Sequence, residues 1–168
     1  MRNSDRVLGQ DGGKKDIMIG AIIGDIVGSR FEFGAAPQEG FELFTPDCSY
    51  TDDTVCTVAV ADAVLNGRSY QESLLDWCRR YPDPMGGYGN RFNRWIHSEH
   101  PLPMDSFGNG AAMRVSPIGW LFDEWEDVLE EAKKSAIVSH NHPEGVKGAQ
   151  CIAETICWLR LMRFPKSS

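Results

Sequence analysis

The stretch SYTDDT, residues 49–54, places two adjacent carboxylates and three aliphatic hydroxyl groups at the entrance to an apolar, helix-like segment. In one interpretation, Ser49 or Thr51 caps this helix while Asp52 and Asp53 complement the positive end of its dipole. In the other, the apolar helix starts near the protein interior, where carboxylates need a partner. Hydroxyl and carboxylate oxygens together suit Mg²⁺ or Mn²⁺. The residues alone favour the cap and leave a metal site open.

Two further stretches carry residues that could bind a ligand. In SFGNGAAMRVSPIG (106–119), glycines flank Asn109 just before an expected helix. In one interpretation the exposed backbone amides cradle a phosphate, and in the other, which the stretch by itself favours, the segment is a plain helix N-cap. In SHNHPEG (139–145), His140 and His142 are a weak zinc signal without a matching cysteine or third histidine. This second stretch is otherwise a turn between helices, or a place where one imidazole faces a ligand.

The elements that must position these residues follow a helical period. Loops rich in Gly and Pro separate them and strands do not alternate with them, which predicts an all-α domain. We expect helices over residues 17–33, 51–67, 70–81, 124–140 and 143–162, with a short one before Pro101 and another starting near Asn109.

The first of these segments, residues 17–33, also fits a buried strand, but its charged residues favour a helix. Gly20, Gly24 and Gly28 then lie on one side, and glycine inside a helix costs about 1 kcal/mol relative to alanine. Three glycines on one side predict that another backbone approaches this helix closely.

Composition narrows the class of protein. A chain of 168 residues fits one globular domain, and its net charge of −7 argues against nucleic-acid binding driven by bulk electrostatics. No apolar run approaches the roughly 20 residues that span a bilayer. Five cysteines without metal-like spacing indicate reduced thiols and a cytoplasmic location. We expect a disordered polar leader over 1–16, a helical domain over 17–162 and a short basic tail over 163–168.

Four ordered motifs, GAIIGDIVGSRFE, YTDDT, FGNGAAMRVSPIG and SHNHPEGVKGA, resemble the ADP-ribosylglycohydrolase family. The resemblance covers about residues 17 to 158. It implies a compact, multi-helix, all-α fold with a cleft that holds two Mg²⁺ or Mn²⁺ ions. Members of this family cleave the N- or O-glycosidic bond between ADP-ribose and an acceptor. The implied partner is therefore an ADP-ribosylated protein or a small-molecule ADP-ribose conjugate.

The resemblance also implies roles for individual residues. Thr51, Asp52 and Asp53 match the first group of metal ligands, and Glu32 matches an acidic residue near the scissile bond. A loop around the diphosphate and distal ribose is matched by Ser106, Phe107, Gly108, Asn109 and Gly110, and a histidine that contacts the ligand is matched by His140. The GGYG at 86–89 resembles a flexible loop that shapes the cleft.

One departure from the family pattern concerns length. Family members are longer, and a second D-x-D-T-like motif near their C-terminus completes the metal site, whereas this chain contains no such motif. We therefore expect a C-terminally truncated domain, with apolar surface left on the helix after Asp53 and around Ile152, Ile156 and Leu159. Such a chain should either form a homo-oligomer through that surface or be only marginally stable. Two alternatives to the hydrolase follow: a catalytically incomplete ADP-ribose-binding module, and a structural protein, because the resemblance extends to lens crystallins.

Overall fold

The computed structural model describes residues 19–34 and 36–163, and all regular secondary structure within them is helical. The all-α prediction is therefore confirmed. The expected leader, residues 1–16, and the expected basic tail, except Arg163, lie outside the described residues. The α-helices are α3 (Ile19–Gly28), α4 (Asp52–Asn66), α5 (Tyr70–Arg80), α6 (Asn90–Ile96), α7 (Ser116–Leu121), α8 (Trp125–Ile137) and α9 (Pro143–Arg163), and the 3₁₀ turns are η1 (Ser29–Phe31) and η2 (Asn109–Ala111).

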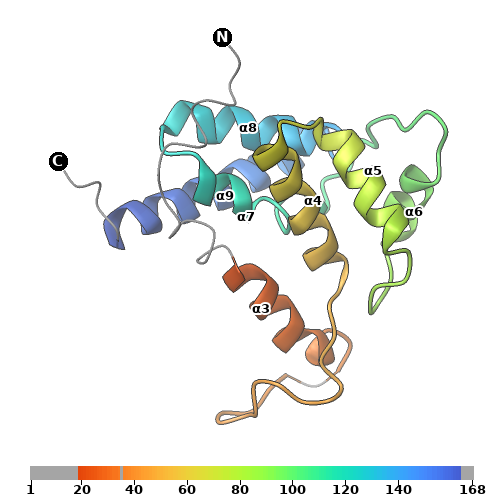
Figure 1. Cartoon of the computed structure of the whole chain (residues 1–168), viewed down its shortest axis with the longest axis vertical. Helices are drawn as coiled ribbons and strands as arrows, with labels where there is room; N and C mark the ends of the chain where they lie inside the picture. The colour runs from red at the N-terminus through yellow and green to blue at the C-terminus, as the bar shows by residue number, and fades with distance from the viewer. Residues whose placement is uncertain (1–18, 35, 164–168) are drawn as a thin grey trace.

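Helix α4 is central, with α3 near its N-terminal end and α5 and α7 packed along it (Figure 1). Cys56, Ala59 and Val60 are fully buried, and their small side chains let the neighbouring helices approach closely. The apolar character of α4 on nearly all sides is thus explained by partners within this chain. The prediction that α4 would expose apolar surface was wrong, because α5 and α7 cover it.

Residues at its two ends fix the length of α4. The Thr51 hydroxyl accepts a hydrogen bond from the Asp53 N–H, and Gly67 ends the helix with a φ of 62° while its N–H donates to the Ala63 carbonyl. Such a left-handed residue at the end of a helix favours glycine. The cap interpretation of SYTDDT and the predicted stop at Asn66-Gly67 are both confirmed.

A second layer is formed by α7, α8 and α9, whose contacts are mostly alanine, valine and isoleucine. Gly119 sets the spacing of α7 and α9, because a Cβ at this position would lie 2.6 Å from the Ala153 carbonyl oxygen. The other face of α9 is left uncovered by the described residues, and Ile152, Trp158 and Leu159 on it are each more than 40% exposed. None of the described helices combines the length and the hydropathy needed to cross a membrane.

Helix α3 differs from the rest because none of its ten residues is buried. A Cβ built on Gly20, Gly24 or Gly28 would meet no atom within 4 Å in the part of the chain that the structure describes. The predicted close approach of another backbone was therefore wrong for the described chain, in which α3 contacts its neighbours mainly through its other side. Ile19 and Ile23 remain 53% and 42% exposed.

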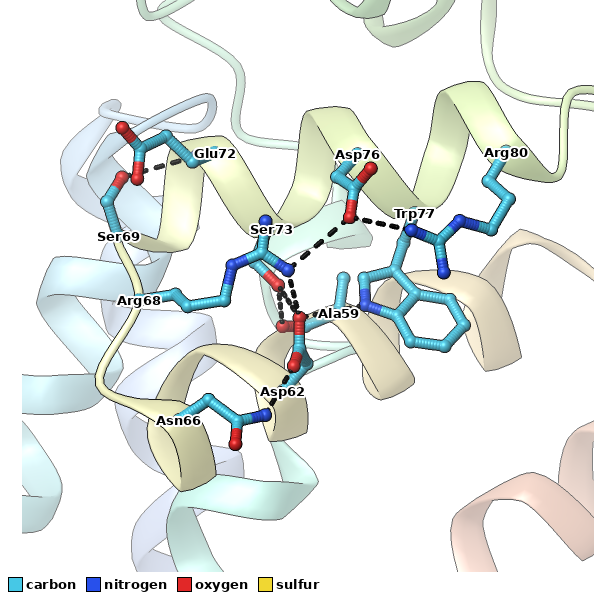
Figure 2. Close-up of polar contacts among 10 residues, drawn as sticks. All are labelled: Ala59, Asp62, Asn66, Arg68, Ser69, Glu72, Ser73, Asp76, Trp77 and Arg80. Atoms are coloured by element: carbon cyan, nitrogen blue, oxygen red, sulfur yellow. Dashed lines mark hydrogen bonds and ion pairs between the residues drawn. The ribbon is translucent and has the colours of Figure 1, made fainter.

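The α4–α5 pair is joined by a hydrogen-bonded carboxylate near the C-terminal end of α4 (Figure 2). One Asp62 oxygen accepts bonds from Arg68 Nη1 at 2.6 Å, Ser73 Oγ at 2.9 Å and Trp77 Nε1 at 3.0 Å. The other accepts from Asn66 Nδ2 at 2.6 Å. Partial burial acts to raise the pKa of Asp62, but these four donors hold it below its ordinary value. Asp62 is thus stabilised as an anion where two helices meet.

Replacement of Asp62 by alanine should lower the free energy of unfolding by about 2–4 kcal/mol, because it removes the acceptor of the Trp77 indole N–H and the anion that pairs with Arg68, while the Ser73 hydroxyl keeps the Ala59 carbonyl as its acceptor. Asp76→Ala is the matched control, since Asp76 is 40% exposed and pairs only with arginines at the surface. That variant should lose less than about 1 kcal/mol. Urea unfolding at pH 7 measures both values, and equal losses would contradict the central role of Asp62.

The contribution of Asp62 should also depend on pH. Its pKa is lower in the folded than in the unfolded chain, so its stabilisation is complete above the unfolded value of about 3.9 and is lost as the pH falls through the folded value. The difference in unfolding free energy between the natural chain and Asp62→Ala should therefore shrink on acidification. A difference that stays constant from pH 7 to about pH 3 would contradict this linkage.

Candidate active site

The candidate site begins with Asp25 of α3, which contacts the first turn of α4. Its Oδ2 accepts bonds from the Thr51 N–H at 2.9 Å and from the Thr54 N–H and hydroxyl at 3.2 and 2.5 Å. Its Oδ1 accepts from the Thr51 hydroxyl at 2.6 Å. Helix α3 is thereby fixed to the helix start that carries the predicted metal ligands.

Asp25 was not among the predicted site residues. The sequence does carry a signal for it, because Asp25 is the single charged residue between Ile17 and Ser29. A lone carboxylate in an apolar helix needs donors, and its donors are supplied by the threonines of a segment 26 and 29 residues further along the chain.

Thr51 is 3% exposed, and its hydroxyl has two partners. It donates to Asp25 and accepts from the Asp53 N–H at 3.2 Å, so its oxygen keeps one acceptor position. The residue therefore caps α4 and presents an oxygen at a fixed position, which agrees with both interpretations of the motif.

Carboxylates of like charge gather around this oxygen. Burial raises the pKa of Asp52 to about 6, and the negative charges of Asp53, Glu32 and Asp25 act in the same direction. The pKa of Asp53 is also raised, first by burial and then by Asp25 and Glu32. Among the described residues, every charged neighbour that acts on either pKa is another carboxylate. Such a cluster is costly unless protons or a cation neutralise it.

A cleft of about 470 Å³ opens beside this cluster, between α3, the start of α4 and η2. Four predicted site residues line it: Glu32, Thr51, Asp53 and Asn109. Gly24 and Gly28 form part of its wall, so their side of α3 faces the cleft. The remaining predicted residues are not among those lining the cleft: Asp52, Ser106, Phe107, Gly108, Gly110 and His140.

The loop that leads into η2 is packed on His140 and on the start of α9. A Cβ on Gly110 would lie 2.7 Å from His140 Nε2, and a Cβ on Gly145 would lie 2.7 Å from the Ser106 carbonyl oxygen. Two glycines thus permit the close approach that places Asn109 at the cleft. Phe107 projects from the loop and is 74% exposed.

His140 lies beneath this loop and is 6% exposed. Burial, together with the charges of Arg114 and Arg91, lowers its pKa to about 4, so the imidazole is neutral at pH 7. Its Nδ1 lies 2.9 Å from the Ser139 hydroxyl. In this position the ring supports the backbone of the loop, and its predicted contact with a ligand stays a prediction.

The GGYG segment lies near Phe33 and Glu32 but is not among the residues that line the cleft. Gly86 and Gly87 have φ values of 79° and 71°, which favour glycine. A Cβ on Gly86 would lie 3.0 Å from the Phe33 ring and 3.5 Å from Glu32 Oε2. Gly86 thus approaches Phe33 and Glu32 closely, and the role of this loop in shaping the cleft stays a prediction.

The residues offer part of a metal site. Within the described chain, no three His, Cys, Asp or Glu side chains form a group that would hold a metal ion. The Thr51 hydroxyl and the Asp52 and Asp53 carboxylates are nevertheless hard oxygen donors at a point of unbalanced negative charge. That chemistry fits one side of an Mg²⁺ or Mn²⁺ site.

Comparison with known proteins decides the family. A model of the ADP-ribosylglycohydrolase family matches residues 3–166. The chain belongs to this family. It is similar to the ADP-ribosylhydrolase ARH3 of Xenopus tropicalis (27% identical over 162 residues, 79% of this chain and 46% of the relative) and of Danio rerio (26% over 182 residues, 89% and 48%). The human protein of the same name is 28% identical over 167 residues, 79% of this chain and 46% of the relative.

This member of the ADP-ribosylglycohydrolase family spans about half the length of the curated relatives it matches. Its resemblance through four motifs is thereby confirmed at the level of the family. The matched region contains the whole cleft, including the segments that carry Asp25, Thr51 and Asn109.

Replacement of Asp25 by alanine should release α3 from α4, because no α3 side chain is buried elsewhere in the described chain. We expect faster amide exchange over residues 19–28 and earlier tryptic cleavage after Arg30, with little change in α8 and α9. Glu32→Gln is the control, since it alters a nearby acid without removing the acceptor of the Thr51 and Thr54 bonds. Unchanged exchange in Asp25→Ala would contradict this tether.

Gly110→Ala should displace the loop or His140, since the new Cβ has only 2.7 to 2.8 Å to the imidazole. We expect a loss of about 1–3 kcal/mol in the free energy of unfolding. Gly108→Ala is the control in the same loop, because its Cβ would meet only Ser106 Oγ, at 3.4 Å. Thermal unfolding separates the two variants, and equal melting temperatures would refute the packing argument.

Proposed function

We propose that this protein is a metal-dependent hydrolase that removes ADP-ribose from an acceptor by cleaving its N- or O-glycosidic bond. One observation carries the proposal: the cleft joins Glu32, Thr51 and Asp53 with Asn109 of the glycine-rich loop. Family membership supports the same activity. Relatives that are named ADP-ribosylhydrolase ARH3 match about half of their length to this chain, so the activity of the whole protein remains a proposal.

The proposed roles follow from position and chemistry. Cleavage of a ribosyl bond passes through an oxocarbenium-like state, which needs negative charge nearby and a positioned water. Glu32 lines the cleft with a carboxylate that could take a proton from this water. Asn109 and the backbone amides of residues 106–110 would hold the diphosphate, with His140 supporting the loop from below.

The carboxylates of Asp52 and Asp53, with the Thr51 hydroxyl, would hold the divalent cation. When bound, Mg²⁺ or Mn²⁺ would orient the ribose hydroxyls and lower the pKa of a coordinated water. The role of Asp25 is positional: it holds the Thr51 oxygen through a 2.6 Å bond and so fixes one donor relative to the two acids.

A second candidate is a module that binds ADP-ribose without cleaving it. The observation that favours it is the single oxygen cluster, since the described residues offer no second group of acids for a binuclear site. The two candidates share the loop and the cleft and differ only in turnover. A structural role, as in crystallins, would require neither binding nor cleavage of ADP-ribose.

The deciding experiment is a calorimetric titration of the purified chain with Mg²⁺ in the presence of ADP-ribose, followed by an assay of ADP-ribose release. Saturable metal binding with release supports the hydrolase, and ligand binding without release supports the binding module. No binding of either ligand would contradict both.

Asp52→Asn and Asp53→Asn should each weaken Mg²⁺ binding at least tenfold, because each removes a charged oxygen donor from the cluster. Release of ADP-ribose should fall in parallel. Asp76→Asn is the control, as this acid lies on α5 and pairs with surface arginines. Metal affinity that is unchanged in the double variant Asp52→Asn/Asp53→Asn would overturn the ligand assignment.

We further propose that the chain forms a homo-oligomer through the exposed face of α9, where Trp158, Leu159 and Met162 are 57%, 54% and 65% exposed. Sedimentation over a concentration series should show association, and Trp158→Glu/Met162→Glu should abolish it. Leu102→Glu is the control, since this residue is 76% exposed on a loop. A monomer at every concentration would refute the proposal.

The cytoplasmic location stays a prediction.

A further inference from the structure

Two thiols face each other between α4 and α5, behind the candidate site. Cys56 and Cys78 have their Sγ atoms 3.9 Å apart, and their exposed fractions are 0% and 1%. Neither residue belongs to the cleft, and neither has a role in the proposed hydrolysis. Cys56 lies one helical turn after Asp52, so a change at this thiol pair acts on the helix that carries the acids.

A buried arginine, which has no acid partner among the described residues, lies near enough for its charge to act on both thiols. Arg114 is fully buried, and its Nη2 donates to the Ser135 carbonyl and the Ser139 hydroxyl, both at 2.8 Å. Its Nε and Nη1 have no hydrogen-bond partner among the described residues. An unpaired buried cation is costly, and the anionic form of a nearby thiol would lower that cost.

The two thiols share one contact in which either sulfur can be the donor. Burial acts to raise the pKa of both cysteines, whereas the Arg114 charge acts to lower both. The arginine therefore favours a thiolate at this pair, and a thiolate is the nucleophilic form of cysteine.

We propose that Cys56 and Cys78 are a dithiol site that a small peroxide converts into an intramolecular disulfide. The thiolate of one cysteine attacks one peroxide oxygen, which breaks the O–O bond and gives a sulfenic acid and hydroxide. The sulfur of the other cysteine then displaces the sulfenic oxygen, and its proton ends in water. Two thiols and one peroxide give one disulfide and two waters.

The two sulfurs are already close to bonding distance. A disulfide has an S–S length of about 2.05 Å and the Sγ atoms lie 3.9 Å apart, so they must approach by roughly 2 Å. Burial excludes bulky oxidants and thiol reagents, which should react first at the exposed Cys151 and the half-buried Cys48. The class of reagent is therefore a small, uncharged peroxide.

The test uses the complete chain in its folded, reduced form, with hydrogen peroxide as the oxidant. Trypsin separates Cys56, in peptide 31–68, from Cys78, in peptide 69–79. Because peptide 31–68 also contains Cys48, the parent protein carries Cys48→Ser. We expect a link between these two peptides that dithiothreitol reverses. The melting temperature should rise by roughly 5 °C, because the bond closes a loop between positions 22 residues apart.

Controls locate the bond. Cys56→Ala and Cys78→Ala in the parent should each abolish the link, while Cys151→Ser should leave it intact. The link in the parent chain is itself decisive if an alanine variant does not fold. The proposal is overturned if peroxide gives a sulfinic acid at Cys56 or Cys78 without a link, or if a link forms only after unfolding in urea. A link that joins Cys78 to Cys151 or Cys157 would overturn it equally.

Discussion

Four hydrogen bonds to one carboxylate, that of Asp25, hold α3 against the start of α4. No residue of α3 is fully buried in the described chain, and the printed hydrogen bonds between this helix and the start of α4 all run to this one side chain. The wall of the cleft formed by Gly24 and Gly28, and the turn that leads to Glu32, follow from the same contact. Hydrogen bonds to one side chain therefore help to position α3, whereas apolar packing positions α7, α8 and α9.

The acidic side chains at the two ends of α4 have opposite electrostatic surroundings. Near its C-terminal end, Asp62 has a neighbouring arginine and three other donors, and its pKa is lowered. At its N-terminal end, Asp52 and Asp53 have other carboxylates as charged neighbours, and their pKa values are raised. Acids that the fold leaves without counter-charges within the described chain are typical of functional sites, whereas a satisfied acid such as Asp62 is typical of structural ones.

The sequence predicted the parts of the structure that depend on local signals. The Thr51 cap, the stop at Gly67 and the long helices could be predicted because propensity and period act over a few residues. The cover of α4 by α5 and α7 could not, since periodicity does not say which helices meet. Asp25 was missed for a related reason, because its donors come from a segment 26 residues away.

The site itself was predicted in part. Glu32, Thr51, Asp53 and Asn109 do meet at one cleft, as motif resemblance implied. The position of His140 beneath Gly110 could not be inferred from spacing, because it depends on how closely two distant backbones approach. A glycine in a motif can indicate that another segment packs closely against it, but it does not indicate which segment that is.

The network around Asp62 has a consequence for the order of folding. Its donors lie within 15 residues of it, so the α4–α5 hairpin closes only a short loop and should form early. Helix α3 should dock later, because Asp25 gains its donors only after the first turn of α4 exists. During synthesis on a ribosome, α3 emerges before Thr51 and Thr54 do. This apolar helix would therefore lack its contacts with α4 until α4 has also emerged. Pulse-labelled hydrogen exchange should then show protection of α4 before that of α3, and the reverse order would exclude this sequence of events.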